Sequence, residues 1–237
     1  VDSLLAYLDD NISVVSEVNF DRLSQVINQF QQDPQLLTSH RNGKNTMSCY
    51  ILYLTEGLFE DCHNLLWRAK IFYNLSKVIT WKKIASYLPT NVYQLPQLLA
   101  ILPNIESEES DDRWYISYMI LSWVYVLVLS PFKLEKSSSE IHRITLQYDG
   151  YQSLKVIVSH IRAQLFVKNS ELFNVHKYEM DPFTLNCYLK VVKCPIDKEL
   201  LSHFTQQCLH DTDTERNMII NLKLLPKLFK MNARYKD

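Results

Sequence analysis

Hydrophobic residues along this chain recur mostly at intervals of three and four residues, the spacing of one face of an α-helix. Leu4, Leu5, Leu8, Ile12 and Val15 form the first such stripe and predict an amphipathic helix at the start of the chain. The same pattern predicts further helices over residues 20–30, 47–59, 65–80, 96–102, 113–134, 151–167, 184–192, 199–208 and 218–229. Short strands separated by tight turns are absent from the pattern, so the hydrophobic spacing indicates an all-α fold.

The most apolar stretch runs from Arg113 to Leu134 and has no charged side chain between Arg113 and Lys133. A helix of this composition is either enclosed by protein on nearly every side or lies in lipid. Its serines, its closing Pro131 and its strongly apolar neighbours favour a central buried helix, so we expect no membrane span. A membrane anchor formed by this stretch stays open as the alternative.

Two polar stretches separate the predicted helices. Glu106–Asp112 carries five acidic residues in seven positions and predicts a flexible acidic loop near 104–112. The serine run in Lys136-Ser-Ser-Ser139 predicts a polar loop near 135–150. We expect both loops to belong to a single helical-repeat domain over 1–237, which is itself a fragment of a longer chain.

Composition supports this prediction, because only three glycines occur and hairpins or glycine-rich phosphate loops have little material to form from. Successive helices joined by short polar turns are typical of a HEAT/armadillo-type α-α superhelical solenoid, although no internal repeat can be aligned. The predicted fold class is therefore an all-α solenoid of that type.

Charge and chemical motifs argue for protein binding. The chain has 25 basic and 26 acidic residues, a balance that disfavours nucleic acid as a partner. The odd number of cysteines and their wide spacing suit reduced thiols in a cytosolic protein. Cys62-His63 and the set His203, Cys208 and His210 lack the paired spacing of a zinc site. No nucleophile with an identifiable base can be assembled, so we expect a non-catalytic binding module without cofactor or metal.

Basic and aromatic residues interleave over residues 67–83, and two interpretations of this segment stay open. Its members are Trp67, Arg68, Lys70, Phe72, Tyr73, Lys77, Trp81, Lys82 and Lys83. In one interpretation the aromatic rings lie in the core while the basic side chains are solvated. In the other they form a patch that contacts an acidic protein surface.

Three blocks, in order, carry a resemblance to a known family. They are Gln31–Leu37, the proline-punctuated block Lys77–Leu99 that includes Trp81-Lys82, and the spacing Trp114-x3-Tyr118-x4-Trp123-x7-Pro131-Phe132. Together they resemble the N-terminal part of tubulin-folding cofactor D. The chain departs from the family at Ser117, where Arg is usual, and at Lys133, where Asp is usual, so it resembles a divergent member.

The resemblance implies a cytoplasmic, cytoskeleton-associated helical-repeat chaperone. It implies binding of β-tubulin or αβ-tubulin, action with other tubulin-folding cofactors in assembling and dissociating the heterodimer, and control by a small Arf-like GTPase. It also implies a contribution to stimulating GTP hydrolysis by tubulin. Lys77, Trp81 and Lys82 match a family block and are the candidate protein-binding residues. The alternative is a helical-repeat scaffold or adaptor for another complex, of the transport or vesicle type.

Overall fold

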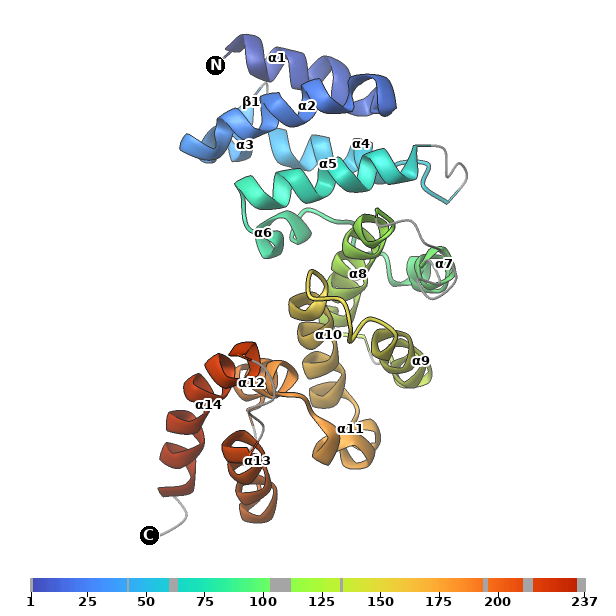
Figure 1. Cartoon of the computed structure of the whole chain (residues 1–237). Coiled ribbons are helices and arrows are strands. Elements are labelled where there is room, and N and C mark those ends of the chain that lie inside the picture. The colour runs from blue at the N-terminus through green and yellow to red at the C-terminus, as the bar shows by residue number, and fades with distance from the viewer. Residues whose placement is uncertain are drawn as a thin grey trace. The chain divides into compact units, whose positions relative to one another are not determined.

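The computed structural model describes residues 2–41, 43–59, 64–102, 112–132, 134–193, 196–210 and 215–233, and most of them are helical (Figure 1). This confirms the prediction of an all-α fold. Contacts divide the chain into two compact units, Val1–Ser130 and Pro131–Asp237. The single domain predicted over 1–237 stays a prediction, and each unit is described by itself.

The first unit begins with helices that pair in sequence order. Its α-helices are α1 (Asp2–Asn11), α2 (Glu17–Gln29), α3 (Gln35–Thr38), α4 (Thr46–Thr55), α5 (Leu65–Val78), α6 (Trp81–Ala85), α7 (Leu95–Ile101) and α8 (Trp114–Leu129). The short strands β1 (His40–Arg41) and β2 (Lys44–Asn45) form an antiparallel pair. Helix α5 lies between α2 and α8 and contacts both, so it is the centre of this unit.

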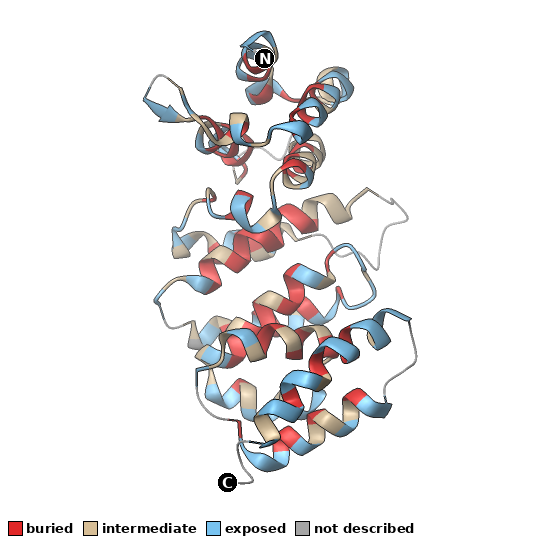
Figure 2. Cartoon of the chain, turned by 90° about the vertical axis from the view of Figure 1, so that its left-hand side faces the viewer, coloured by how far each residue is buried: buried red, intermediate tan, exposed pale blue. Residues whose placement is uncertain are grey.

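Helix α8 corresponds to the most apolar stretch of the sequence and is largely buried. It packs against α5, α6 and α7, and most of its side chains are buried, including Trp123, Ser117 and Ser122 (Figure 2). The Ser122 hydroxyl donates to the Tyr118 carbonyl oxygen at 2.7 Å, which satisfies a polar group inside the core. None of the described helices has both the length and the apolar character needed to cross a membrane.

The second unit stacks its helices in a similar way. They are α9 (Glu135–Leu146), α10 (Lys155–Lys168), α11 (Ser170–His176), α12 (Pro182–Val191), α13 (Lys198–His210) and α14 (Glu215–Ala233). Helix α12 contacts both α10 and α14, and α13 packs along α14. Asp181 accepts hydrogen bonds from the backbone N–H groups of Phe183 and Thr184, and Pro182 occupies the first turn of α12. Helix α12 therefore begins two residues before the predicted range 184–192.

The polar loop predicted near 135–150 is wrong for most of its length, because residues 135–146 form α9. The serine run indicated a loop, yet one side of this helix is buried through Ser138, Ile141 and Thr145. The Ser138 hydroxyl donates to the Leu134 carbonyl oxygen at 2.7 Å, so this buried polar group has a hydrogen-bond partner. Tertiary burial of Ile141 therefore outweighs the low helix propensity of serine.

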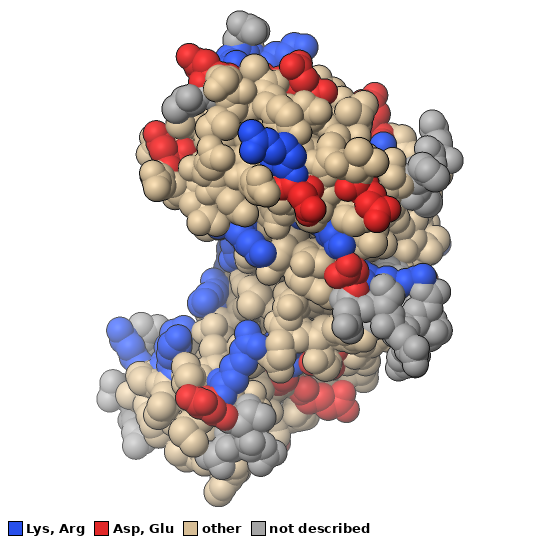
Figure 3. Space-filling model, turned by 45° about the horizontal axis from the view of Figure 1, so that its top comes forward, with Lys and Arg blue, Asp and Glu red and all other residues tan. Residues whose placement is uncertain are grey.

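Some predictions lie outside the described residues. They concern Cys62-His63 and the acidic loop apart from Asp112. On the visible surface of the described part, basic and acidic side chains are mostly interspersed (Figure 3), as the balanced composition leads one to expect.

Candidate protein-binding site

The candidate site lies in a segment of the first unit that has an excess of basic residues. Residues 64–102 contain five basic side chains and no Asp or Glu, and they form α5, α6 and α7. The basic residues are Arg68, Lys70, Lys77, Lys82 and Lys83. The structure separates them into two groups with different surroundings.

Arg68 and Lys70 have structural partners. Arg68 donates from Nη1 to the Glu56 carbonyl oxygen at 2.8 Å. Lys70 forms an ion pair of 2.6 Å with Asp112, and its Nζ lies 4.5 Å from the centre of the Trp67 ring. A cation held between a carboxylate and an aromatic face stabilises the fold and has little capacity left for a partner.

Lys77, Lys82 and Lys83 form the second group, and all three are exposed where α5 ends and α6 begins. Lys77 Nζ lies 4.4 Å from the centre of the Tyr73 ring, and Lys82 Nζ lies 5.7 Å from that of Trp81. Within the described part of the chain, no carboxylate lies within ion-pair distance of these lysines. We call Tyr73, Lys77, Trp81, Lys82 and Lys83 the basic–aromatic surface.

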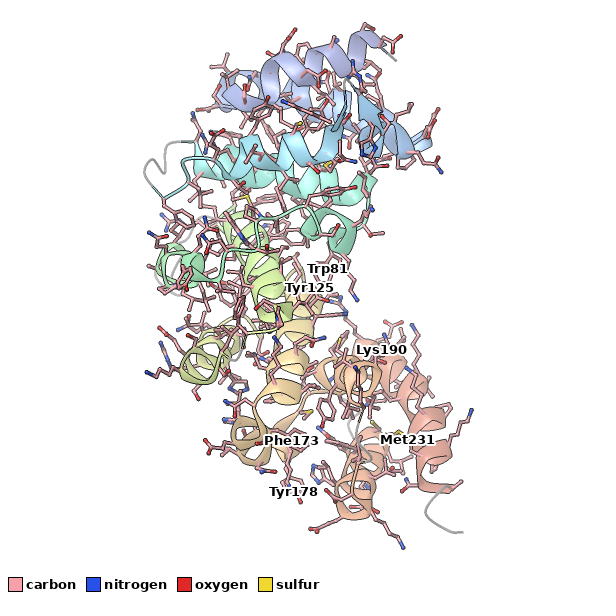
Figure 4. All side chains as sticks on the ribbon, turned by 180° about the vertical axis from the view of Figure 1, so that it is seen from behind. Trp81, Tyr125, Phe173, Tyr178, Lys190 and Met231 are labelled. Carbon is pink, nitrogen blue, oxygen red and sulfur yellow. The ribbon has the colours of Figure 1, made fainter. Side chains whose placement is uncertain are left out.

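Trp81 is positioned by helix α8. Its ring lies 5.1 Å from that of Tyr125 at an angle of 60°, and both residues are labelled in Figure 4, where they lie next to each other. Helix α5 ends at Val78, and the extended Thr80 turns the chain into the short α6 that begins with Trp81. The Trp81 ring is half-buried, so one part contacts α8 and another faces solvent.

Polar contacts join the helices beneath this surface and restrict their movement relative to one another. The Ser76 and Tyr118 hydroxyl groups lie 2.9 Å apart and join α5 to α8. Burial raises the pKa of Tyr118, which keeps its phenol neutral and able to hydrogen-bond at physiological pH. The indole N–H of Trp123 donates to the Pro89 carbonyl oxygen at 2.7 Å and attaches the segment after α6 to α8. The surface is therefore carried by a rigid framework, which lowers the entropic cost of binding.

The chemistry of the basic–aromatic surface suits protein recognition. Exposed lysines attract an acidic partner and increase its rate of association. A half-exposed tryptophan provides the large contact area that dominates many interfaces. The aromatic rings under the ammonium groups orient the lysines without neutralising them.

A pocket of about 420 Å³ lies elsewhere in the first unit and is lined in part by Asp9, Arg41 and Tyr50. Asp9 accepts from the Tyr50 hydroxyl at 2.8 Å and from Arg41 Nη1 at 3.0 Å. Burial and this contact with Asp9 raise the pKa of Tyr50. These three polar groups satisfy one another.

A charge network around the buried Arg162 lies in the second unit. Arg162 donates to the Thr145 carbonyl oxygen and to Asp149 Oδ1, both at 2.7 Å, and its Nη1 lies 3.6 Å from Asp181. Lys155 lies within 3.5 Å of both Asp149 and Asp181. The neighbouring cavity of about 80 Å³ holds no more than a few water molecules. This network joins α9, α10 and the start of α12, and its role is structural.

The second unit also brings a thiol close to an imidazole. Cys187 Sγ lies 3.2 Å from His160 Nδ1. The same Nδ1 lies 2.8 Å from the Val156 carbonyl oxygen, which can only accept, so Nδ1 carries the proton. The thiol therefore faces a donor at Nδ1, while the unprotonated Nε2 lies 3.8 Å from the same sulfur.

No three potential metal ligands come together in the described ranges. On α13, Cys208 is buried, and the His203 ring lies against Tyr178 with its Nε2 3.2 Å from the Tyr178 carbonyl oxygen.

The structure brings the three candidate residues Lys77, Trp81 and Lys82 to one junction. Lys83 of the same basic and aromatic segment lies beside them, with its Nζ 5.4 Å from the Tyr87 ring centre, and the structure adds the supporting Tyr125. The lack of acidic residues over 64–102 is a signal in the sequence that points to Lys83. Nothing in the sequence pairs Trp81 with Tyr125, because they lie on helices that meet only in the fold.

Comparison with known proteins completes this description. The model of the family described as tubulin-specific chaperone D-like, ARM repeat, matches residues 27–172, which is more than half of the chain. The matched part includes α5, α6 and α8, and it confirms the predicted armadillo-type solenoid. No curated protein and no solved structure matches significantly. The chain therefore belongs to the tubulin-specific chaperone D-like family, and its role is related to tubulin chaperoning.

Proposed function

We propose that this chain is a non-catalytic segment of a tubulin chaperone that binds β-tubulin. In this proposal it takes part in assembling and dissociating the αβ-tubulin heterodimer, together with other tubulin-folding cofactors and under control of a small Arf-like GTPase. The observation that carries the proposal is the family match over residues 27–172. The proposed place of action is the cytoplasm, in association with the cytoskeleton.

The basic–aromatic surface is the tubulin contact in this proposal. It lies within the matched residues, it is exposed, and its lysines have no described acidic partner of their own. Trp81 would supply apolar contact area, while Lys77 and Lys82 would face acidic side chains of tubulin. The same arrangement supports binding without chemistry, because it contains only cations and aromatic rings.

Size-exclusion chromatography tests the proposal directly. The purified chain is mixed with αβ-tubulin, and separately with a small Arf-like GTPase in its GTP-bound form, and each mixture is compared with its components. We expect an earlier-eluting peak that contains the chain and tubulin. Separate elution in both mixtures, with a chain whose circular dichroism shows a folded helical protein, would contradict the proposal.

A further inference from the structure

A second basic surface lies in the second unit, on helix α14. Residues 216–233 contain Arg216, Lys223, Lys227 and Lys230 and no Asp or Glu. The intervals of seven, four and three residues place all four on one face of the helix. All four side chains are exposed. The acidic residue of α14 is Glu215 at its first position, and no acidic residue is interleaved among the four basic ones.

This face continues onto helix α12. Lys227 donates from Nζ to Asn186 Oδ1 at 3.0 Å, and Lys190 follows Asn186 by one helical turn. Lys190 is exposed and is labelled on α12 in Figure 4. We call Lys190, Arg216, Lys223, Lys227 and Lys230 the α12–α14 basic surface.

The charges of this surface are not compensated by the unit. Lys227 contacts the neutral Asn186, and Arg216 contacts the neutral Gln152 and the Phe183 ring, whose centre lies 5.5 Å from its Cζ. No carboxylate of the described residues lies within ion-pair distance of any member. Asp149 and Asp181 of the same unit are engaged by Lys155 and Arg162. These two carboxylates are therefore occupied by other cations of the unit.

Such an arrangement is unfavourable for the isolated helix. Like charges four residues apart, such as Lys223 and Lys227, destabilise a helix, whereas an acidic partner would remove this repulsion. The chain as a whole has a net charge of −1, so it does not attract polyanions through its overall field. Any attraction must come from a local surface of this kind.

We infer that the α12–α14 basic surface binds an Asp- and Glu-rich segment of a partner protein. Ile220, Leu224 and Leu228 of α14 are buried in the unit, whereas Met218, Ile219, Leu222 and Phe229 are exposed on the same helix and would add apolar contact area to such an interface. Binding to an anionic membrane is the alternative that the test below examines separately. The inference does not depend on the proposed tubulin contact, which lies in the other unit.

The test uses the whole chain and a fluorescent oligoglutamate peptide, with binding followed by fluorescence anisotropy. We expect saturable binding that weakens as salt is added. The double variant Lys223→Gln/Lys230→Gln removes two charges that make no described contact, and it should weaken binding roughly tenfold. The matched control is Lys136→Gln/Arg143→Gln, which removes two exposed charges at the same seven-residue spacing on α9. The control should bind within about twofold of the unmodified chain.

Three results would overturn the inference. One is unchanged binding in Lys223→Gln/Lys230→Gln, and another is an equal loss in the α9 control. The third is binding to vesicles of anionic lipid without binding to the peptide. A further variant, Lys77→Gln/Lys82→Gln, separates the two surfaces. If that variant loses the peptide while Lys223→Gln/Lys230→Gln keeps it, the acidic segment binds the first unit and the inference is wrong.

Discussion

Trp123 Nε1 donates a hydrogen bond of 2.7 Å to the carbonyl oxygen of Pro89. The indole is almost completely buried, and its ring also lies 5.8 Å from that of Phe59. Pro89 belongs to the segment that follows α6, whereas Trp123 lies in the middle of α8. This bond therefore attaches an irregular segment to the most apolar helix of the chain and helps hold the basic–aromatic surface in place.

Replacing Trp123 with Phe should destabilise the first unit. The substitution leaves the Pro89 carbonyl without its donor and opens a space beside α8. We expect a loss of about 2–3 kcal/mol in the free energy of unfolding, measured by urea denaturation. Trp81→Phe is the control, since Trp81 is half-buried and keeps an aromatic contact, and it should cost less than about 1 kcal/mol. Equal losses in the two variants would show that the bond to Pro89 does not matter.

Replacing Arg162 with Met should be among the most damaging changes in the second unit. Arg162 is 4% exposed and contacts Asp149, Asp181 and Thr145, so its removal leaves carboxylates without their main partner. We expect the free energy of unfolding to fall by about 3 kcal/mol. Arg143→Met, on the exposed side of α9, should change it by less than about 0.5 kcal/mol. A small effect of Arg162→Met would mean that Lys155 alone neutralises both aspartates.

His142 predicts a pH dependence of stability. Burial, followed by the neighbouring His176 and Arg162, lowers the pKa of His142 to about 4 from an ordinary value of 6.5. Between these values the unfolded chain binds a proton that the folded chain does not, so the free energy of unfolding falls as the pH falls from 6.5 towards 4. The contribution of this residue is up to about 3 kcal/mol.

The measurement is urea denaturation at a series of pH values from neutral to mildly acidic. His142→Gln stays neutral throughout, so its stability should decline less steeply with falling pH than that of the unmodified chain. Parallel pH profiles for the two proteins would exclude His142 as a source of the decline.

Ser117 and Ser122 of α8 offer a matched pair. Both are fully buried, but the Ser117 hydroxyl has no hydrogen-bond partner among the described residues, whereas that of Ser122 donates to the Tyr118 carbonyl oxygen. Ser117→Ala removes an unpaired buried polar group and should leave stability unchanged or raise it by up to about 1 kcal/mol. Ser122→Ala removes a satisfied group and should be the less stable of the two variants. The reverse order in thermal unfolding would contradict this account.

The basic–aromatic surface predicts a specific loss of tubulin binding. Lys77→Gln/Lys82→Gln removes two exposed charges and should weaken the complex roughly tenfold, with a reduced dependence on salt. Trp81→Ala should also weaken it, because it removes apolar contact area. Affinities can be measured by microscale thermophoresis with labelled tubulin. Lys136→Gln/Arg143→Gln again provides the control and should bind normally. Unchanged affinity in both surface variants would place the tubulin contact elsewhere on the chain.

Sequence periodicity predicted most helices, because a helix that buries one face has hydrophobic residues at regular intervals. The predictions for residues 65–80, 151–167 and 199–208 agree with α5, α10 and α13 to within a few residues. The prediction was wrong at α9, where a serine run indicated a loop. Burial in the second unit stabilises a helix there. The prediction also missed the short helices α6 and α11, which are too brief for a periodic pattern to form.

By itself, the sequence determined the helical class, the buried character of α8 and the resemblance that the family match confirmed, because hydrophobic spacing and local motifs are properties of neighbouring residues. It also placed Lys77, Trp81 and Lys82 close together, since they lie within a few positions of one another. Only the tertiary structure decided which basic residues are neutralised. The ion pairs Lys70–Asp112 and Arg162–Asp149 join residues that are far apart along the sequence, so no local pattern predicts them. The difference between a structural cation and one available to a partner depends on which carboxylate folding brings within a few ångströms.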